Sequence, residues 1–364
     1  MRPQALFAIG AAALAATLVG MTLLPHKPYV RWQNLRAEAY ARLGWIYERV
    51  HYDPTPVDVA FVGTSHTMNG VDAAVVAQAM GAAGARTPAG QCPTATNFAM
   101  PNYGRSLHWV VAREILETKP VKLLVLEVIE NESRKPHPQF VHAATTRDVL
   151  TAPALVNLNY FNDIVRLPFR QASLAVESLA PEQFGLKSRF DPADYDGSTV
   201  DNTRVVNVNG QALTPERNTS LPAAELDDEA EQNLRNKNLH MLPKPLQSLE
   251  FALPRYYLRR ILDLADKKGV RVVFLYLPGY GQPPQPYDMS DYQGREMLKV
   301  NDILADRSLW FDVHHLNAEG AHRLSERLGG LLAPEFHAAP NPATSGACSN
   351  GLPPRPSLKP FHKP

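Results

Sequence analysis

The sequence predicts a three-layer α/β/α domain in which a mainly parallel β-sheet lies between two layers of helices. Short apolar, β-branched runs at residues 57–62, 94–98 and 121–129 are typical of buried parallel strands. Amphipathic helical patterns follow at residues 71–80 and 104–117. This alternation favours a parallel sheet, because consecutive parallel strands need a crossover, which a helix usually supplies.

The alternation stops in the middle of the chain and then returns. Residues 131–248 are rich in loops and polar runs, so we expect an insertion or cap over the sheet there. Helical segments are expected within it at about 151–167 and 227–236. The expected elements after it are a helix at 255–268, a strand at 270–277, a helix at 292–306, a short strand at 309–311 and a helix at 317–328.

The N-terminal segment, residues 1–30, carries an uncharged apolar run over residues 5–24. At about 1.5 Å per residue, this run is long enough to span a bilayer core. It predicts an uncleaved inner-membrane anchor with the body of the chain in the periplasm. A cleaved signal peptide, which would give a secreted protein, is the alternative, although the run ends in a poor cleavage site. Residues 31–56, with a helical pattern at 33–50, are expected to link the anchor to the domain.

The net charge, the C-terminal composition and the cysteines limit the classes of protein that this sequence fits. The net charge is only +1, with no basic stripe, which argues against nucleic-acid binding. The catalytic domain is expected over residues 57–335. The Pro-rich tail at 336–364 lacks apolar content and is expected to be disordered. The two cysteines, Cys92 and Cys348, could form a disulfide in an oxidising compartment or remain two thiols.

Ser65 is the first candidate for chemistry. It lies in the sequence Gly-Thr-Ser-His directly after the first predicted strand. In an open parallel sheet, ligands bind beyond the carboxyl ends of the strands, so a serine there would face the crevice. A serine that only caps the following helix would fit the same pattern.

The second candidate cluster holds Asp312 and His315, three residues apart after the last predicted strand. A serine hydroxyl is a poor nucleophile until a base takes its proton. A histidine whose other ring nitrogen is held by a carboxylate is suited to that task. A solvated turn before the next helix, capped by Asn317, is the alternative. Considered together with Ser65, the cluster predicts a Ser-His-Asp triad.

An early Ser after the first strand and a late Asp-x-x-His resemble the SGNH (GDSL-like) hydrolase superfamily. The likeness covers about residues 57–131 and 270–328 and extends to membrane-anchored proteins of cell-envelope polysaccharide O-acetylation and teichoic-acid D-alanyl transfer. It implies a flavodoxin-like sheet with Ser65 as nucleophile, His315 as general base and Asp312 as its orienting partner.

The resemblance also implies an oxyanion hole, for which this chain departs from the pattern. The expected Gly of the second block falls on Asn102, which tolerates left-handed backbone, and Gly104 is the fallback. In the third block Asn131 is kept as a side-chain donor but the Gly is lost. The usual Gly-Asp-Ser becomes Gly-Thr-Ser.

His66 is expected either to contact substrate or to pack the turn. With Asp312, His314 and His315 it could form a zinc site, but no paired Cys or His-Glu-x-x-His spacing supports one. We therefore expect neither a metal nor a cofactor. Glu127 and Glu130, at the end of the third strand, could form a buried acid pair, but we rather expect at least one of them to face solvent or to bond to a nearby turn.

These observations predict a serine esterase or O-acyltransferase that acts on acyl, most simply acetyl, esters. Its substrate would be a cell-envelope polysaccharide or a small acyl ester, and a membrane acyl-donor protein could be its partner. The triad does not choose between water and a sugar hydroxyl as acceptor. The alternative is a non-catalytic envelope protein that keeps the fold to bind glycan or to assist polysaccharide assembly.

Overall fold

The computed structural model contains one five-stranded sheet, in which every strand is parallel to its neighbours. The strands lie in the order β2-β1-β3-β6-β7, which is the 2-1-3-4-5 order of flavodoxin-like folds. The strand bounds are β1 Val59–Val62, β2 Ala95–Asn97, β3 Leu123–Val128, β6 Arg271–Tyr276 and β7 Met297–Leu298. The described residues are 2–34, 41–130, 134–204, 206–208, 211–214, 217–237, 242–286 and 289–336.

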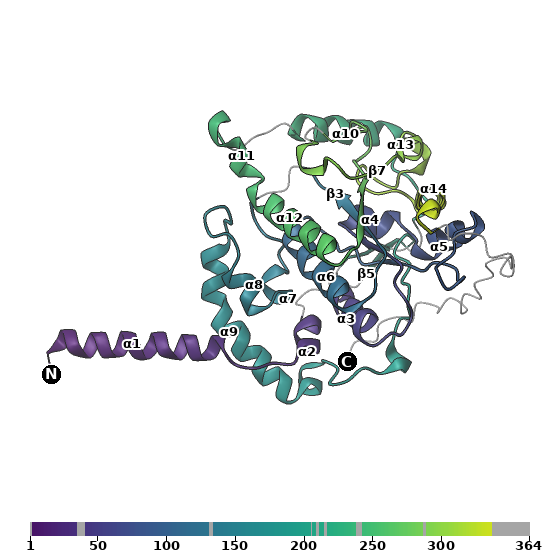
Figure 1. Ribbon diagram of the computed structural model, residues 1–364. Coiled ribbons are helices and arrows are strands. Elements are labelled where there is room, and N and C mark those ends of the chain that lie inside the picture. The colour runs from purple at the N-terminus through teal and green to yellow at the C-terminus, as the bar shows by residue number, and fades with distance from the viewer. Residues whose placement is uncertain are drawn as a thin grey trace.

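Helices cover both faces of the sheet, so the predicted three-layer α/β/α fold is confirmed (Figure 1). Alternate residues of β1 enter the two cores: Ala60 and Val62 pack on one side, Val59 and Phe61 on the other. One core is covered by α3 (Arg42–His51), α6 (Arg105–Thr118) and α12 (Ala252–Lys267), and the other by α5 (Ala73–Ala82), α10 (Ala223–Lys237) and α14 (Ala318–Leu332).

The segment between the N-terminal helix and the sheet is part of the first core. The helix predicted at 33–50 occurs in part: α2 (Pro28–Gln33) ends where it would begin, residues 35–40 lie outside the described residues, and α3 forms its second half. Trp32 and Ile46 are both fully buried in the core. The aromatic side chains of both short helices need this burial, which fixes the chain against the domain.

The connection from β3 to β6 contains the long middle segment. The predicted helices near 151–167 and 227–236 occur as α9 and α10, with shifted bounds. Its elements are α7 (Phe140–Ala143), α8 (Thr146–Leu150), α9 (Tyr160–Leu179), the antiparallel pair β4 (Val206–Val208) and β5 (Gln211–Thr214), α10, and α11 (Gln247–Glu250) before the crossover helix α12.

Two predicted elements near the C-terminus were wrong. The helix expected at 292–306 is interrupted by Gly294, whose φ is +77°, and then gives way to β7, which pairs with β6 at the sheet edge before the short helix α13 (Asn301–Leu304). The strand expected at 309–311 is replaced by a 3₁₀ turn, Arg307–Leu309, which Asp306 caps by accepting from Ser308 N–H. A single bridge between Trp310 and Leu316 follows.

Helix α1 (Pro3–Thr22) projects away from the body and buries none of its residues (Figure 1). It is long and apolar enough to cross a membrane, and a signal sequence at an N-terminus would have the same properties. Residues 337–364, which hold the predicted disordered tail and Cys348, lie outside the described residues. Cys92 is not a free thiol, and its pairing with Cys348, one of the two alternatives that the sequence left open, stays a prediction.

Candidate active site

The predicted triad residues come together at the carboxyl ends of the parallel strands. Ser65 is the first residue of α4 (Ser65–Gly70), which starts three residues after β1 ends. His315 and Asp312 lie in the loop between the Arg307–Leu309 turn and α14. His315 Nε2 lies 3.0 Å from Ser65 Oγ, and His315 Nδ1 lies 3.0 Å from each carboxylate oxygen of Asp312. The fold thus brings together Ser65 and His315, which are 250 residues apart in the sequence.

The contacts of His315 determine which of its nitrogens carries the proton. Because a carboxylate can only accept, Nδ1 donates to Asp312 and Nε2 is left to accept from Ser65. Burial alone would raise the pKa of Asp312. The hydrogen bonds from the His315 ring and from two backbone N–H groups outweigh burial and lower this pKa to about 2. Asp312 is therefore an anion at neutral pH and can stabilise a protonated His315.

The loop that carries Asp312 and His315 is held mainly by its own atoms. Asp312 Oδ1 accepts from the backbone N–H groups of His314 and His315, each at 2.8 Å. Phe311 N–H donates to His315 O at 2.8 Å. His315 and Asp312 are therefore oriented mainly by a single short turn, whose backbone also accepts hydrogen bonds from Leu221 N–H and Tyr280 N–H.

The turn that carries Ser65 depends instead on a distant side chain. Glu127 of β3 is buried, and its carboxylate accepts from Thr64 N–H and Thr64 Oγ1, both at 2.7 Å. It also accepts from Thr67 Oγ1 and, at 3.3 Å, from Thr67 N–H. Two backbone N–H groups and two hydroxyls therefore donate to this carboxylate, which as a buried acceptor needs such donors. Glu127 is thus neither solvent-facing nor paired with Glu130, which accepts from Tyr276.

This carboxylate explains the residues that precede the serine. A Cβ at Gly63 would lie 2.3 Å from Glu127 Oε2 and 2.5 Å from Thr67 Oγ1, so only glycine fits. Thr64 donates its hydroxyl to Glu127 and accepts from His66 N–H as the cap of α4. An aspartate at position 64 would set a second carboxylate against Glu127. A threonine at position 64 therefore matches the carboxylate on β3.

Asn97, at the end of β2, is a second positioning residue that the sequence did not reveal. Its Nδ2 donates to Thr67 O at 2.9 Å and to Val71 O at 2.8 Å, which satisfies carbonyls at the end of α4. Its Oδ1 accepts from Ala99 N–H at 3.0 Å. One side chain thus links the nucleophile helix to the loop after β2.

The predicted oxyanion residues have different outcomes. Asn102 has a φ of +67°, so it does adopt the left-handed backbone expected of it, and its loop is tied to the nucleophile turn through Met100 N–H and Gly63 O. Gly104 is needed for packing, because a Cβ there would lie 2.4 Å from His137 Cβ. Asn131 lies outside the described residues.

His66 borders the triad and is held as a neutral ring. Its Nδ1 lies 2.8 Å from Leu277 O, so Nδ1 carries the proton, and Nε2 can accept from Tyr103 Oη at 3.2 Å. Burial lowers the pKa of His66, and the neighbouring His315 lowers it further, against the opposite effect of Glu127. Its ring lies 5.6 Å from that of His315 and 5.9 Å from that of His314. His66 and Tyr103 therefore lie together beside the triad residues.

An open pocket of about 440 Å³ adjoins the loop that carries Asp312 and His315, residues 311–316, which we call the acid–base loop. The pocket lies between this loop and α10. Asp312 and His314 contribute to its lining, whereas Ser65 and His315 do not. The remaining lining residues are Leu221, Glu229, Gln232, Asn233 and Val313. The middle segment of the chain thus forms one side of a hollow next to the triad.

Within the described part of the chain, no group of three or more His, Cys, Asp or Glu side chains could hold a metal ion. Comparisons with protein-family models, with curated proteins and with solved structures found no match to this chain. The chemistry of the site must therefore be inferred from its own residues.

Proposed function

We propose that this protein is a serine-dependent esterase or O-acyltransferase. The observation that carries the proposal is the continuous path from Ser65 Oγ to His315 Nε2 and from His315 Nδ1 to Asp312. A surface serine that merely caps a helix would not require such a base. The flavodoxin-like strand order and the place of Ser65 after β1 also suit the SGNH-type hydrolase that the sequence resembles.

In the proposed reaction, Ser65 Oγ attacks an ester carbonyl while His315 Nε2 takes the hydroxyl proton. Asp312 stabilises the imidazolium that forms. Because Ser65 is the first residue of α4, its backbone N–H has no acceptor within the helix and is free for the oxyanion, with Asn102 in the adjoining loop as a second donor. His315 then returns the proton to the leaving alcohol, and an acyl-enzyme remains on Ser65.

Water or a sugar hydroxyl would resolve the acyl-enzyme, with His315 again as the base. The proposed substrate is an acyl, most simply acetyl, ester of a cell-envelope glycan, with the domain in the periplasm and α1 as its membrane anchor. The open pocket beside the triad supports a polymeric or bulky partner more than a fully enclosed small molecule. A membrane acyl-donor protein would supply the acyl group if the enzyme is a transferase.

Labelling with a fluorophosphonate probe tests the proposal, because such probes react with activated serines. The wild-type protein should be modified at Ser65, and Ser65→Ala and His315→Ala should abolish the labelling. Hydrolysis of p-nitrophenyl acetate should fall on the order of 10⁶-fold in Ser65→Ala, as for other serine triads.

Ser308→Ala is a matched control, because Ser308 is exposed and donates to the carboxylate of Asp306 but has no histidine beside it. This variant should label and hydrolyse like the wild type. Equal hydrolysis by wild type and Ser65→Ala would instead favour the non-catalytic envelope protein. Addition of a glycan acceptor should then separate transfer from hydrolysis by the appearance of acylated sugar.

A further inference from the structure

Helix α9 has apolar side chains on two faces: Leu167 and Leu174 pack inward, and a second apolar row points to the outside. Phe161, Val165 and Phe169 are 75%, 66% and 60% exposed. Their spacing of four residues places them on one face, which Val176 and Leu179 continue. A surface helix in water normally has a polar outer face, so this exposed apolar row on α9 is unusual.

The inward face of α9 is held by hydrogen bonds. Arg170 is buried and donates to Val141 O, Ala144 O and Gln171 Oε1. Gln171 Nε2 in turn donates to Leu24 O at 3.2 Å. These partners fix the rotation of α9 about its axis, so the outward direction of its apolar face is a built feature of the fold.

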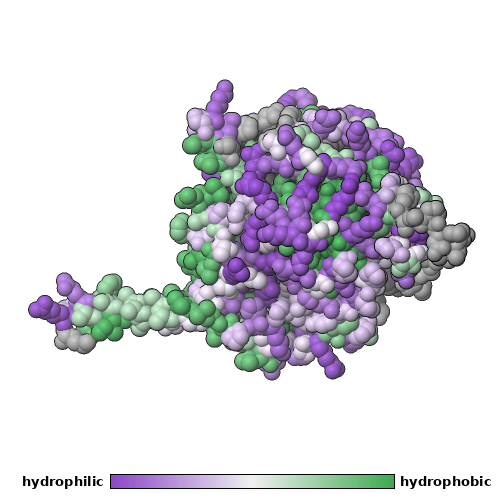
Figure 2. Space-filling model, viewed as in Figure 1, coloured by the Kyte–Doolittle hydropathy of each residue, from purple (hydrophilic) through white to green (hydrophobic). Residues whose placement is uncertain are grey.

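The exposed face of α9 lies beside the point where α1 leaves the body. The two helices pack together, and Lys27 N–H, shortly after α1, donates to Ser178 Oγ of α9 at 2.9 Å. In Figure 1, α9 runs crosswise to α1 along the side of the body from which α1 projects. Figure 2 shows hydrophobic surface along that same side, continuous with the base of α1.

The loop that leads into α9 adds to this surface. Leu155 is fully exposed and Leu158 is 55% exposed. Arg166 is a charged side chain among the exposed residues of α9, and a long cationic side chain can reach lipid headgroups from an apolar face. Patches of this kind on soluble surfaces mark an interaction site.

We infer that the outer face of α9 lies in the interfacial region of the same bilayer that α1 enters, as a second membrane contact. The inference rests on the proposed anchoring by α1. A bilayer is the occupant that fits, because a span along α1 sets the membrane plane crosswise to it, where α9 already lies. An interfacial helix buries its apolar face about 5–10 Å into the boundary between headgroups and acyl chains. The two contacts together would hold the body, and its triad, in one orientation over the membrane.

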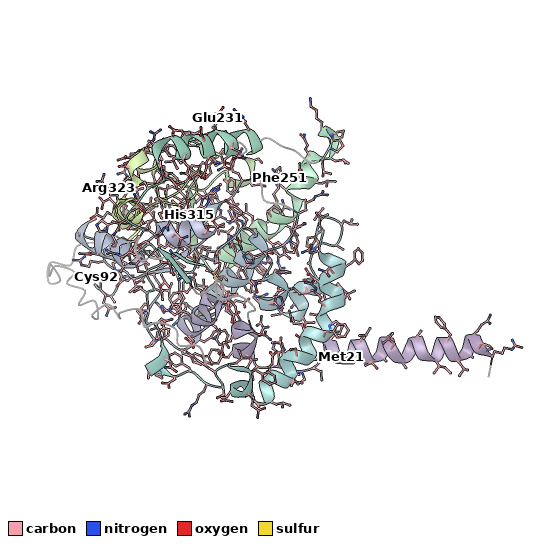
Figure 3. All side chains as sticks on the ribbon, turned by 180° about the vertical axis from the view of Figure 1, so that it is seen from behind. Met21, Cys92, Glu231, Phe251, His315 and Arg323 are labelled. Carbon is pink, nitrogen blue, oxygen red and sulfur yellow. The ribbon has the colours of Figure 1, made fainter. Side chains whose placement is uncertain are left out.

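The experiment uses the full-length protein in vesicles of phosphatidylethanolamine and phosphatidylglycerol that contain no other protein. An environment-sensitive fluorophore is attached at Val165→Cys or, in a second variant, at Phe161→Cys. Arg323→Cys is the matched control, since Arg323 is exposed on α14 and lies across the body from Met21 in Figure 3. The protein without an added cysteine supplies the labelling background.

Lipids with a spin label near the headgroup should quench the fluorophore at 165 and at 161 several-fold more than at 323. A spin label deep in the acyl chain should quench the same positions less, because the contact is shallow. Equal quenching at 165, 161 and 323 would overturn the inference. Quenching or a blue shift that arises only after a membrane acyltransferase is added would also overturn it, in favour of a protein partner.

Discussion

The two halves of the candidate site are built in different ways. The loop that carries Asp312 and His315 is oriented mainly by contacts among residues 311–316, chiefly the donation of two neighbouring N–H groups to Asp312, with two backbone hydrogen bonds from Leu221 and Tyr280 outside it. The nucleophile turn is held by Glu127 of β3 and Asn97 of β2, which are distant in sequence. Damage to the loop should therefore stay local, whereas damage to the turn should spread into the sheet.

The difference also concerns burial. Glu127 is only 2% exposed, whereas the side chain of Asp312 is 29% exposed. A buried acceptor that loses its donors has no water to replace them, so its removal is costly. The partly exposed loop can rehydrate. Four predictions separate these two kinds of support.

Asp312→Asn should give the largest effect on activity with a small effect on folding. The introduced side-chain amide would donate to His315 Nδ1 and move the ring proton to Nε2, where it blocks proton transfer from Ser65. Hydrolysis should fall about 10⁴-fold. The free energy of unfolding should fall by no more than about 1–2 kcal/mol, the share of the lost charge, because the carbonyl of the new side chain can still accept from the two backbone N–H groups.

A large loss of folded protein in Asp312→Asn would contradict the self-contained loop. Measurement of kcat and Tm on the same preparation distinguishes the two outcomes.

Gly63→Ala should be the most damaging change in the nucleophile turn. Its methyl group would lie 2.3 Å from Glu127 Oε2, and overpacking of this kind costs about 1–3 kcal/mol. Gly330→Ala is the control, because a Cβ at that helical position meets nothing within 4 Å. Urea unfolding should therefore show a lower midpoint for Gly63→Ala only.

If Gly330→Ala and Gly63→Ala unfold alike, the close approach of Glu127 to the turn is incorrect.

Glu127→Gln should weaken both stability and activity. The amide NH₂ group of the introduced glutamine is a donor, and it would face Thr64 and Thr67, which are donors to Glu127 in the wild type. The unmade hydrogen bonds should lower the free energy of unfolding by about 1–3 kcal/mol. A displaced Ser65 should lower kcat by about 10²-fold. Urea unfolding and p-nitrophenyl acetate hydrolysis measure the two effects.

Glu130→Gln serves as the comparison, since a glutamine at this position can still accept from Tyr276. A Glu127→Gln variant with full activity would show that Ser65 does not depend on the strand β3.

The smallest expected effect is on the pH dependence of stability. Asp312 has a lowered pKa in the folded protein, about 2 against 3.8, so its contribution is complete above pH 3.8 and is lost as the pH falls toward 2. Wild type should lose about 1–2 kcal/mol relative to Asp312→Asn over that window, because partial exposure screens the charge. Urea unfolding of both proteins between about pH 5 and pH 3 should already show that the difference in free energy of unfolding between wild type and Asp312→Asn begins to decrease.

Much of the sheet was predictable, because strands buried on both faces are continuous apolar runs. The three early strands and the strand before Leu277 occur where periodicity placed them. The edge strand β7 was missed, since its two residues carry no pattern and depend on pairing with β6. The strand predicted at 309–311 failed for a related reason: Leu309 and Trp310 are buried, but in a turn rather than a ladder.

The site divides in the same way. Asp312 and His315 could be paired from their spacing, whereas the left-handed backbone of Asn102 was expected because the resemblance sets a glycine at this position and Asn tolerates that backbone. A hydrogen bond from Glu127 or Glu130 to a nearby turn was expected, but the sequence did not indicate that the turn is the one that carries Ser65, and it gave no sign of the role of Asn97. The donors to Glu127 lie about sixty residues earlier in the chain, and only the register of the sheet brings them to it.

The sequence by itself determined the alternation of strands and helices, the apolar length of α1 and the chemical types of the candidate triad, because each of these is a property of neighbouring residues. The tertiary structure alone decided that Ser65 and His315 meet, that Glu127 supports the nucleophile turn, and that the apolar face of α9 points outward beside α1. These features join segments far apart in the chain, and packing rather than local pattern sets which of their side chains come into contact.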